Sequence, residues 1–157
     1  MLQDFFSLLT YLANNFSYIG IFLASLIANA TILFPVPSHL IVFGSGLFLD
    51  PLLVGISAGL GAALGELTGY FIGRGASGII EKKEKFNRIK RKLGFLSRWM
   101  FPVIVIFAAT PLPTDVVGIY CGSVRYSWWK FLLACVIGKT FLFVLIAETG
   151  AGIKLLF

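Results

Sequence analysis

Two proline-broken stretches with the same pattern constrain this chain more than any other feature. They run from Leu33 to Phe48 and from Ala109 to Val124. Each contains Pro-x-Pro, a polar residue, an ionisable residue and an apolar run that ends at a glycine. Matching residues lie 76 positions apart: Pro35 and Pro111, Pro37 and Pro113, His39 and Asp115, Gly46 and Gly122. After one inserted residue the match continues at Gly61 and Gly138, Gly73 and Gly150, Gly75 and Gly152. We therefore predict an internal duplication, with repeats over 16–74 and 85–152 of a single domain, 1–157.

The composition predicts an integral membrane protein. Hydrophobic residues make up 58% of the chain and charged residues 13%, against about 25% charged in globular proteins. No residue from Phe5 to Leu49 carries a formal charge apart from the titratable His39. Because backbone polar groups in lipid must be satisfied within the segment, the predicted class is all-α.

Three stretches are long enough to span a membrane, which takes about 20 apolar residues. They are Phe16–Phe34, Pro51–Gly73 and Phe131–Ala147. Residues 1–15 are expected to form a short interfacial helix. His39–Leu49 is apolar but too short to cross, and it follows two prolines, so we expect a re-entrant half-helix.

Trp99–Val124 is also long enough to span, but Pro111 and Pro113 break it in the middle. If this segment turns back as a hairpin, the cations that follow it, Arg125 and Lys130, join those before it. Eleven of the 13 basic residues then lie on one side, which the positive-inside rule makes cytoplasmic. The two hairpins would enter from opposite sides, as in an inverted repeat.

The segment Arg74–Arg98 holds nine basic and two acidic residues, with Phe86, Ile89 and Leu93 at helical spacing. This pattern is typical of an amphipathic helix on an anionic membrane surface. The charges lie between membrane segments and lack stacking aromatic residues, so we expect no nucleic-acid partner.

Glycine recurs every four residues in the second predicted span, at Gly61, Gly65, Gly69 and Gly73. Such a stripe lets another backbone approach closely. We expect a hairpin to pack against it.

Ionisable residues inside a membrane are candidates for function. They are His39, Glu66, Asp115, Lys139 and, nearer a helix end, Glu148. Each central residue has a structural alternative. Glu66 could have the purely structural role of pairing with Lys139, and Asp115 that of stabilising a helix N-terminus. His39 could be a hydrogen-bonded structural residue rather than a titrating one. Arg98 could hold a phosphate headgroup or be one more cytoplasmic charge.

The sequence contains no glycine-rich phosphate loop, metal cluster or nucleophile–base motif, so we expect no enzyme, cofactor or metal. Hydroxyl groups near the breaks, such as those of Thr110 and Thr114, are expected to satisfy freed backbone groups.

The motifs resemble those of the DedA family, also called the SNARE-associated or VTT-domain family. The first resembling motif is Pro35, Pro37, Ser38, His39 and Gly46, and the second is Gly61, Gly65, Glu66, Tyr70, Gly73 and Arg74. The third is Arg98, Pro102, Pro111 and Pro113, and the last is Phe131 and Gly138. Two positions depart from the family pattern: His39 replaces an acidic residue and Ile104 an arginine.

The resemblance implies movement of phospholipids or polyprenyl-phosphate carriers across a membrane. We therefore expect a transporter or scramblase of an anionic lipid, with membrane lipids as partners, in a prokaryotic plasma membrane. The alternatives are a proton- or ion-coupled transporter of a small solute and a non-transporting membrane scaffold, and the sequence leaves a homo-oligomer open. Arg74 joins Arg98, His39, Glu66, Asp115 and Lys139 as candidate substrate- or ion-binding residues.

Overall fold

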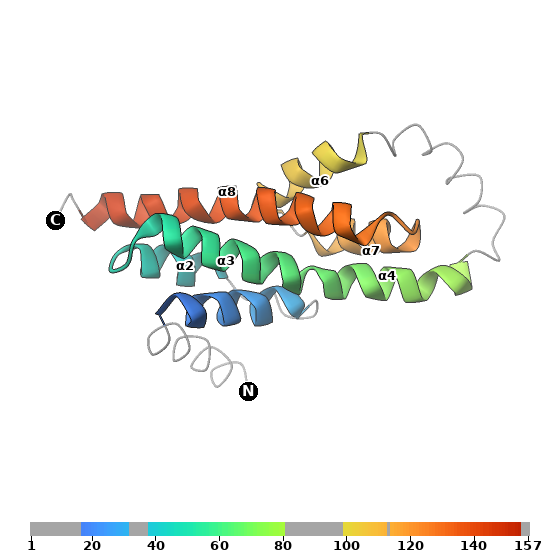
Figure 1. Cartoon of the computed structure of the whole chain (residues 1–157), viewed down its shortest axis with the longest axis horizontal. Helices are drawn as coiled ribbons and strands as arrows, with labels where there is room; N and C mark the ends of the chain where they lie inside the picture. Colours follow the sequence, from blue (N-terminus) through green and yellow to red (C-terminus); the bar gives the residue numbers. More distant parts are fainter. Residues whose placement is uncertain (1–16, 32–37, 81–98, 113, 155–157) are drawn as a thin grey trace.

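The computed structural model describes residues 17–31, 38–80, 99–112 and 114–154, and within these ranges every regular element is a helix. The first helix is Ser17–Ala30, drawn in blue in Figure 1. The others are α2 (Ser38–Gly46), α3 (Pro51–Gly65), α4 (Leu67–Ile80), α6 (Met100–Ala108), α7 (Asp115–Ser123) and α8 (Trp128–Lys154). The predicted all-α class is confirmed.

Two long antiparallel rods form the centre of the molecule (Figure 1). α3 and α4 make one rod, because helical hydrogen bonds continue through the turn at Glu66: its amide donates to Ala62 O at 3.0 Å and its carbonyl accepts from Tyr70 N at 3.3 Å. α8 is the other rod. Gly55 lies against Val144 and Gly59 against Thr140, so residue numbers rise along α3 as they fall along α8. Pro51–Ala76 and Trp128–Ile153 are long and apolar enough to cross a membrane.

Both rods extend beyond the predicted spans. The second span was predicted to end at Gly73, but α4 continues to Ile80. Arg74 lies one helical turn after Tyr70, and its guanidinium donates a hydrogen bond to the Tyr70 hydroxyl at 3.0 Å. α8 starts at Trp128 rather than Phe131, because the carbonyl of Ser127 accepts from Phe131 N at 3.0 Å and closes an earlier turn.

The predicted span Phe16–Phe34 is wrong in its length. The helix ends at Ala30 and has 14 residues, about 21 Å against a hydrocarbon core of about 30 Å. Its end is fixed by side chains: Thr31 Oγ1 donates to Ala28 O at 3.0 Å, and Thr68 Oγ1 donates to Ala30 O at 3.1 Å. The described residues thus hold two helices of spanning length instead of three.

The predicted break in Trp99–Val124 is present. α6 and α7 are separated by a turn that starts at Ala109, where Thr110 Oγ1 donates to Phe107 O at 2.8 Å. In Figure 1, α6 runs toward the centre beside α8 and α7 returns beside α4. α2, α6 and α7 have nine residues each, about 14 Å, or roughly half a bilayer core.

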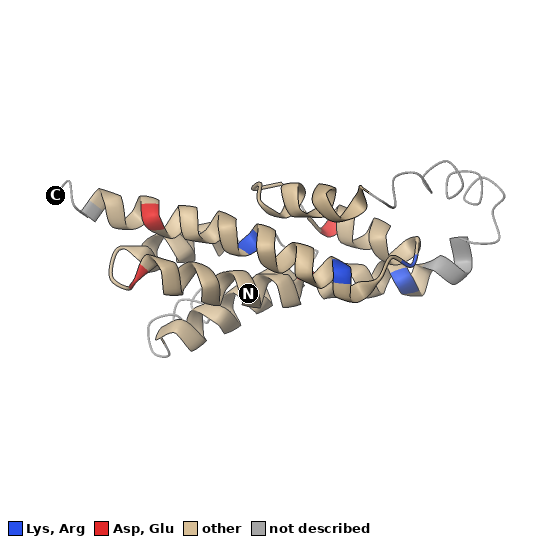
Figure 2. Cartoon of the chain, turned by 45° about the horizontal axis from the view of Figure 1, so that its top comes forward, with Lys and Arg blue, Asp and Glu red and all other residues tan. Residues whose placement is uncertain are grey.

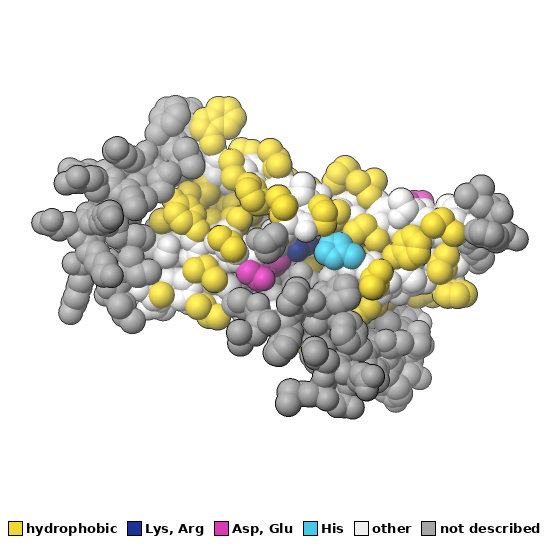
Figure 3. Space-filling model, turned by 180° about the vertical axis from the view of Figure 1, so that it is seen from behind, with side chains coloured by type: hydrophobic (Ala, Val, Ile, Leu, Met, Phe, Trp, Pro, Cys, Tyr) yellow, Lys and Arg dark blue, Asp and Glu magenta, His cyan; other side chains and the backbone are white. Residues whose placement is uncertain are grey.

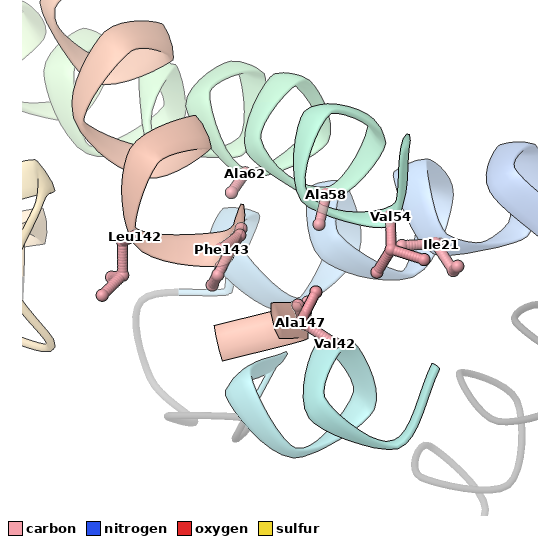
Figure 4. Close-up of a cluster of buried hydrophobic side chains, with 8 residues drawn as sticks. All are labelled: Ile21, Val42, Val54, Ala58, Ala62, Leu142, Phe143 and Ala147. Atoms are coloured by element: carbon pink, nitrogen blue, oxygen red, sulfur yellow. The ribbon is translucent and has the colours of Figure 1, made fainter. Parts of the chain in front are cut away.

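Two apolar cores flank the middle of the rods. The first joins α3 and α8 to α2 and the helix Ser17–Ala30 through eight buried residues, shown in Figure 4: Ile21, Val42, Val54, Ala58, Ala62, Leu142, Phe143 and Ala147. The second joins α4 and the first half of α8 to α6 and α7 around Tyr70, Ile104 and Phe131. The ring of Tyr70 stacks on that of Phe131 at 5.4 Å.

Close glycine contacts in the two cores are related by the offset seen in the sequence. In α4, Gly73 lies against the backbone of Ile119, and in α8, Gly150 lies against that of Phe43. Likewise Gly122 of α7 abuts Tyr70, and Gly46 of α2 abuts Ala147. We call the helix Ser17–Ala30 with α2 the first hairpin and α6 with α7 the second. The second helix of each hairpin packs on the long helix of the other half, α2 on α8 and α7 on α4.

Charged residues separate along the rods (Figure 2). Apart from Lys139 near the centre, the basic residues drawn lie toward the end where α4 leads into residues 81–98, and acidic residues lie at the far end and near the centre. The predicted helix over 1–15, most of the basic block with Arg98, and Pro35, Pro37 and Pro113 lie outside the described residues.

Candidate functional site between the hairpin tips

A buried ion pair joins the two rods near their middle. Lys139 Nζ of α8 lies 2.9 Å from Glu66 Oε1, at the turn between α3 and α4. The two residues are 4% and 2% exposed. Both are more than about 14 Å from the ends of the spans that contain them, at 1.5 Å per residue. A charge at this depth needs a partner of opposite charge, and Glu66 and Lys139 are partners of each other.

Both hairpins contribute hydrogen bonds to this pair. The hydroxyl of Thr114, at the tip of the α6–α7 hairpin, donates to Glu66 Oε1. From the other side, Lys139 Nζ donates to Asn29 Oδ1 at 3.4 Å. Asn29 is held in turn, because its Nδ2 donates to Ser25 O at 2.8 Å. One network thus connects the helix Ser17–Ala30, both rods and the second hairpin.

The duplicated ionisable residues occupy the two tips beside this pair. Asp115 begins α7 and lies within electrostatic range of Glu66 and Lys139. His39, in the first turn of α2, lies within range of Lys139. Its ring makes an edge contact with Phe143, at a centroid distance of 5.5 Å and an interplanar angle of 71°. The structure therefore brings together His39, Glu66, Asp115 and Lys139.

Several buried polar atoms in this region have no hydrogen-bond partner among the described residues. They are Glu66 Oε2, Ser25 Oγ and His39 Nε2. A buried polar atom left unpaired costs about 1–3 kcal/mol. These atoms are where a proton or a polar group of a ligand would bind most favourably.

The cluster opens on a lateral face of the molecule. Figure 3 shows acidic, basic and histidine side chains side by side, with hydrophobic side chains on both sides along the rods. This face is parallel to the long helices, so in a membrane it would look toward lipid rather than toward water.

The other predicted site residues lie elsewhere. Arg74 is exposed at the basic end, where its partner Tyr70 donates to the backbone oxygen of Tyr126. Glu148 is exposed on the last turns of α8. Pro111 is exposed in the hairpin turn. Arg98 lies outside the described residues.

The first part of the glycine stripe packs on the helix Ser17–Ala30, and the last part packs on α7. A Cβ on Gly65 would lie 2.6 Å from Leu26 O, and Gly61 abuts the same helix at Phe22. Farther along, Gly73 abuts α7, whereas a Cβ on Gly69 would lie 3.4 Å from Asp115 O. Close approach is thus required at Gly61, Gly65 and Gly73 and is looser at Gly69.

Sequence reasoning missed two members of the network. Asn29 is an amide within an apolar run, and its polarity alone was the signal that could have found it. Thr114 was expected to satisfy freed backbone, but its hydroxyl binds the carboxylate of Glu66 instead. Among the described residues, no three His, Cys, Asp or Glu side chains come close enough to hold a metal ion.

Comparison with known proteins decides the family. The family model of the VTT domain matches residues 36–151. This range includes α2, α7, the rod of α3 and α4, all but the last three residues of α8, and all four ionisable residues of the cluster. The chain belongs to the VTT-domain family. Its helices of spanning length agree with a family of membrane proteins.

Two similar proteins are vacuole membrane proteins of Arabidopsis thaliana. KMS2 is 40% identical over 122 residues, with 62% of this chain and 29% of the relative covered, and KMS1 is 36% identical over 101 residues, with 52% and 24% covered. The chain thus spans less than a third of either plant protein. The uncharacterized protein MJ0201 of Methanocaldococcus jannaschii is 25% identical over 140 residues, with 88% and 86% covered. No solved structure matches the chain at a significant level.

Proposed function

We propose that this VTT-domain protein moves an anionic lipid, a phospholipid or a polyprenyl-phosphate carrier, between the two leaflets of a membrane. The observation that carries the proposal is the buried pair Glu66–Lys139, held between the tips of two broken hairpins and flanked by Asp115 and His39. An ion pair that only joined two rods would not need unpaired polar atoms around it. Such atoms suit a headgroup that enters and leaves.

The lateral position of the cluster favours a lipid over a small solute. A solute carrier needs an enclosed aqueous cavity, whereas a lipid must keep its hydrocarbon chains in the bilayer while its headgroup crosses. The charged cluster is visible from the side in Figure 3, between hydrophobic surfaces. A headgroup could therefore reach it from the membrane without passing through water.

We further infer that the two hairpins form an inverted repeat, entering from opposite sides and meeting at the midplane. The paired glycine contacts and the nine-residue length of α2 and α7 support this arrangement. Basic residues at one end of the rods make that end cytoplasmic. We take the membrane to be a prokaryotic plasma membrane.

Labelling of single cysteines tests the topology, with Cys121 and Cys135 replaced by alanine. Ser127→Cys, at the basic end, should react with a membrane-impermeant maleimide from the cytoplasmic side, and Thr149→Cys from the opposite side. Leu112→Cys, at the tip, should react poorly from both. Rapid labelling of Leu112→Cys from the side opposite Ser127→Cys would mean that α6 crosses the membrane.

Reconstitution tests the function. Liposomes that contain the purified protein should expose inner-leaflet fluorescent phosphatidylglycerol to an external quencher faster than protein-free liposomes. Liposomes with the heat-unfolded protein serve as the control. A folded protein that leaves the lipid distribution unchanged, but admits a labelled small anion, would contradict the lipid proposal in favour of a solute carrier.

A further inference from the structure

An apolar cavity of about 540 Å³ lies between α6 and α7, the two arms of the second hairpin, and is open on one side. It extends from the base of the hairpin, at Met100 and Cys121, to the tip, at Phe107, Leu112 and Val116. α6 packs on α8 and α7 on α4, so the arms diverge from each other and leave this space between them.

In the first hairpin, small side chains lie where the two described helices meet. Ala24 and Ala28, on the helix Ser17–Ala30, form a small core with Ile41 of α2. Small side chains allow these two helices to pack directly.

The position of the cavity identifies its occupant. Its lining is apolar, so water is disfavoured there, and Phe107, Leu112 and Val116 are exposed along its open side. In the topology proposed above, the hairpin reaches about halfway across a bilayer core, with its base at the interface and its tip near the midplane. A hydrocarbon chain in that leaflet runs the same way, with its polar end at the base.

Charge at the base selects the headgroup. The N-terminal amides of α6 carry a positive partial charge. The residue before the helix, Trp99, makes no side-chain hydrogen bond that caps them. Arg125 is exposed two residues after the end of α7, on a backbone with φ of 57°. Trp99 directly precedes Met100, and Tyr126 N donates to Cys121 O at 2.9 Å, so the start of α6 and the turn that carries Arg125 both lie near the base of the cavity.

We propose that the cavity between α6 and α7 binds one acyl chain of an anionic phospholipid from the basic-side leaflet, with the headgroup at Arg125 and the start of α6. This site goes beyond the proposed function, because a lipid can bind here whether or not it is moved.

Photo-crosslinking tests the proposal without measuring transport. The full chain is reconstituted with phosphatidylglycerol that carries a diazirine in its acyl chain, and adducts are located by mass spectrometry. Adducts should concentrate on α6 and α7. Filling the cavity with Val116→Trp should remove most of them.

Leu40→Trp is the matched control. Leu40 is the counterpart of Val116 in the first hairpin, 76 residues earlier, and the two are 68% and 66% exposed. Leu40→Trp should leave labelling of α6 and α7 unchanged. Equal labelling of the two tryptophan variants and the wild type would overturn the site.

The headgroup is tested with phosphatidylcholine carrying the same chain. Phosphatidylglycerol should label α6 and α7 about fivefold more, as expected for one cation near the surface. Arg125→Gln should remove this preference, while Lys130→Gln should keep it, and circular dichroism would check that both variants fold. Equal labelling by the two lipids in the wild type would overturn the anionic headgroup. Protein crosslinks from the cavity to residues 81–98 or to a second copy, in place of lipid adducts, would overturn the acyl-chain site.

Discussion

The two hairpins make the same contacts with different chemistry. At the second tip, Thr114 binds Glu66 and Asp115 lies beside it. At the first tip, the counterpart of Asp115 is His39, and the counterpart of Glu66 is Phe143, whose ring His39 contacts. One half thus places a carboxylate where the other places an aromatic ring.

The sizes of the side chains that pack between hairpin and rod are also exchanged between the two halves. In the second half, Gly118 of α7 lies close to the backbone of Tyr70, and a Cβ there would be 3.3 Å from Tyr70 N. In the first half, the corresponding residues are Val42 and Ala147, which share a core. The larger residue is on the rod in one half and on the hairpin in the other. The duplicated backbone is therefore kept while the chemistry of each tip differs.

The largest difference in unfolding free energy between the two halves should appear when Glu66 and its counterpart Phe143 are each replaced. Glu66→Gln leaves Lys139 buried without a charged partner and should cost about 3–5 kcal/mol of unfolding free energy. Phe143→Leu, its counterpart, removes part of a buried ring but leaves no unpaired charge, and should cost about 1–2 kcal/mol. Denaturant unfolding in detergent measures both. Equal losses of unfolding free energy for the two variants would contradict the buried ion pair between Glu66 and Lys139.

A smaller difference is expected for the tip hydroxyls. Thr114→Val removes a hydrogen bond to a buried carboxylate and should cost about 1.5–3 kcal/mol. Ser38→Ala, in the half without a carboxylate, should cost less. The same unfolding assay compares the two, and a larger loss for Ser38→Ala would contradict the assignment of the polar tip.

The glycine contacts should behave alike in the two halves. A methyl group on Gly73 or Gly150 meets the backbone of the opposite hairpin, so Gly73→Ala and Gly150→Ala should each cost about 1–3 kcal/mol.

The controls are Gly75→Ala and Gly152→Ala, which lie two residues farther along and whose added Cβ would meet open space. They should be neutral or stabilise the helix by up to about 1 kcal/mol. Thermal unfolding of the four variants compares them. If Gly73→Ala is harmful and Gly150→Ala is tolerated, the halves are not packed equivalently.

Much of this architecture could be predicted from the sequence, because proline and glycine act locally. The breaks before His39 and Asp115, the glycine stripe and the offset between the repeats follow from residue types and spacing. Helix ends were less predictable. α4 continues past Gly73 because Tyr70 accommodates Arg74, and the first helix stops at Ala30 where Thr31 and Thr68 satisfy its last carbonyls.

The sequence could predict the Glu66–Lys139 pair, as the structural alternative for Glu66, but not the hydrogen bonds around it. Burial of charge identified Glu66 and Lys139, which lie 73 positions apart in the chain. The hydrogen bonds of Asn29 and Thr114 depend on which helices pack together, and the cavity depends on how far two arms diverge. Residue spacing along one segment carries no information on either.

Transport by the variant Glu66→Gln with Lys139→Met tests the central claim most directly. The double replacement removes both charges, so it should recover most of the stability that Glu66→Gln alone loses. If the pair takes part in moving the headgroup, the refolded double variant should fail to move labelled phosphatidylglycerol in liposomes, while the wild type moves it. A stable double variant with wild-type activity would contradict the claim and leave the pair only a structural role.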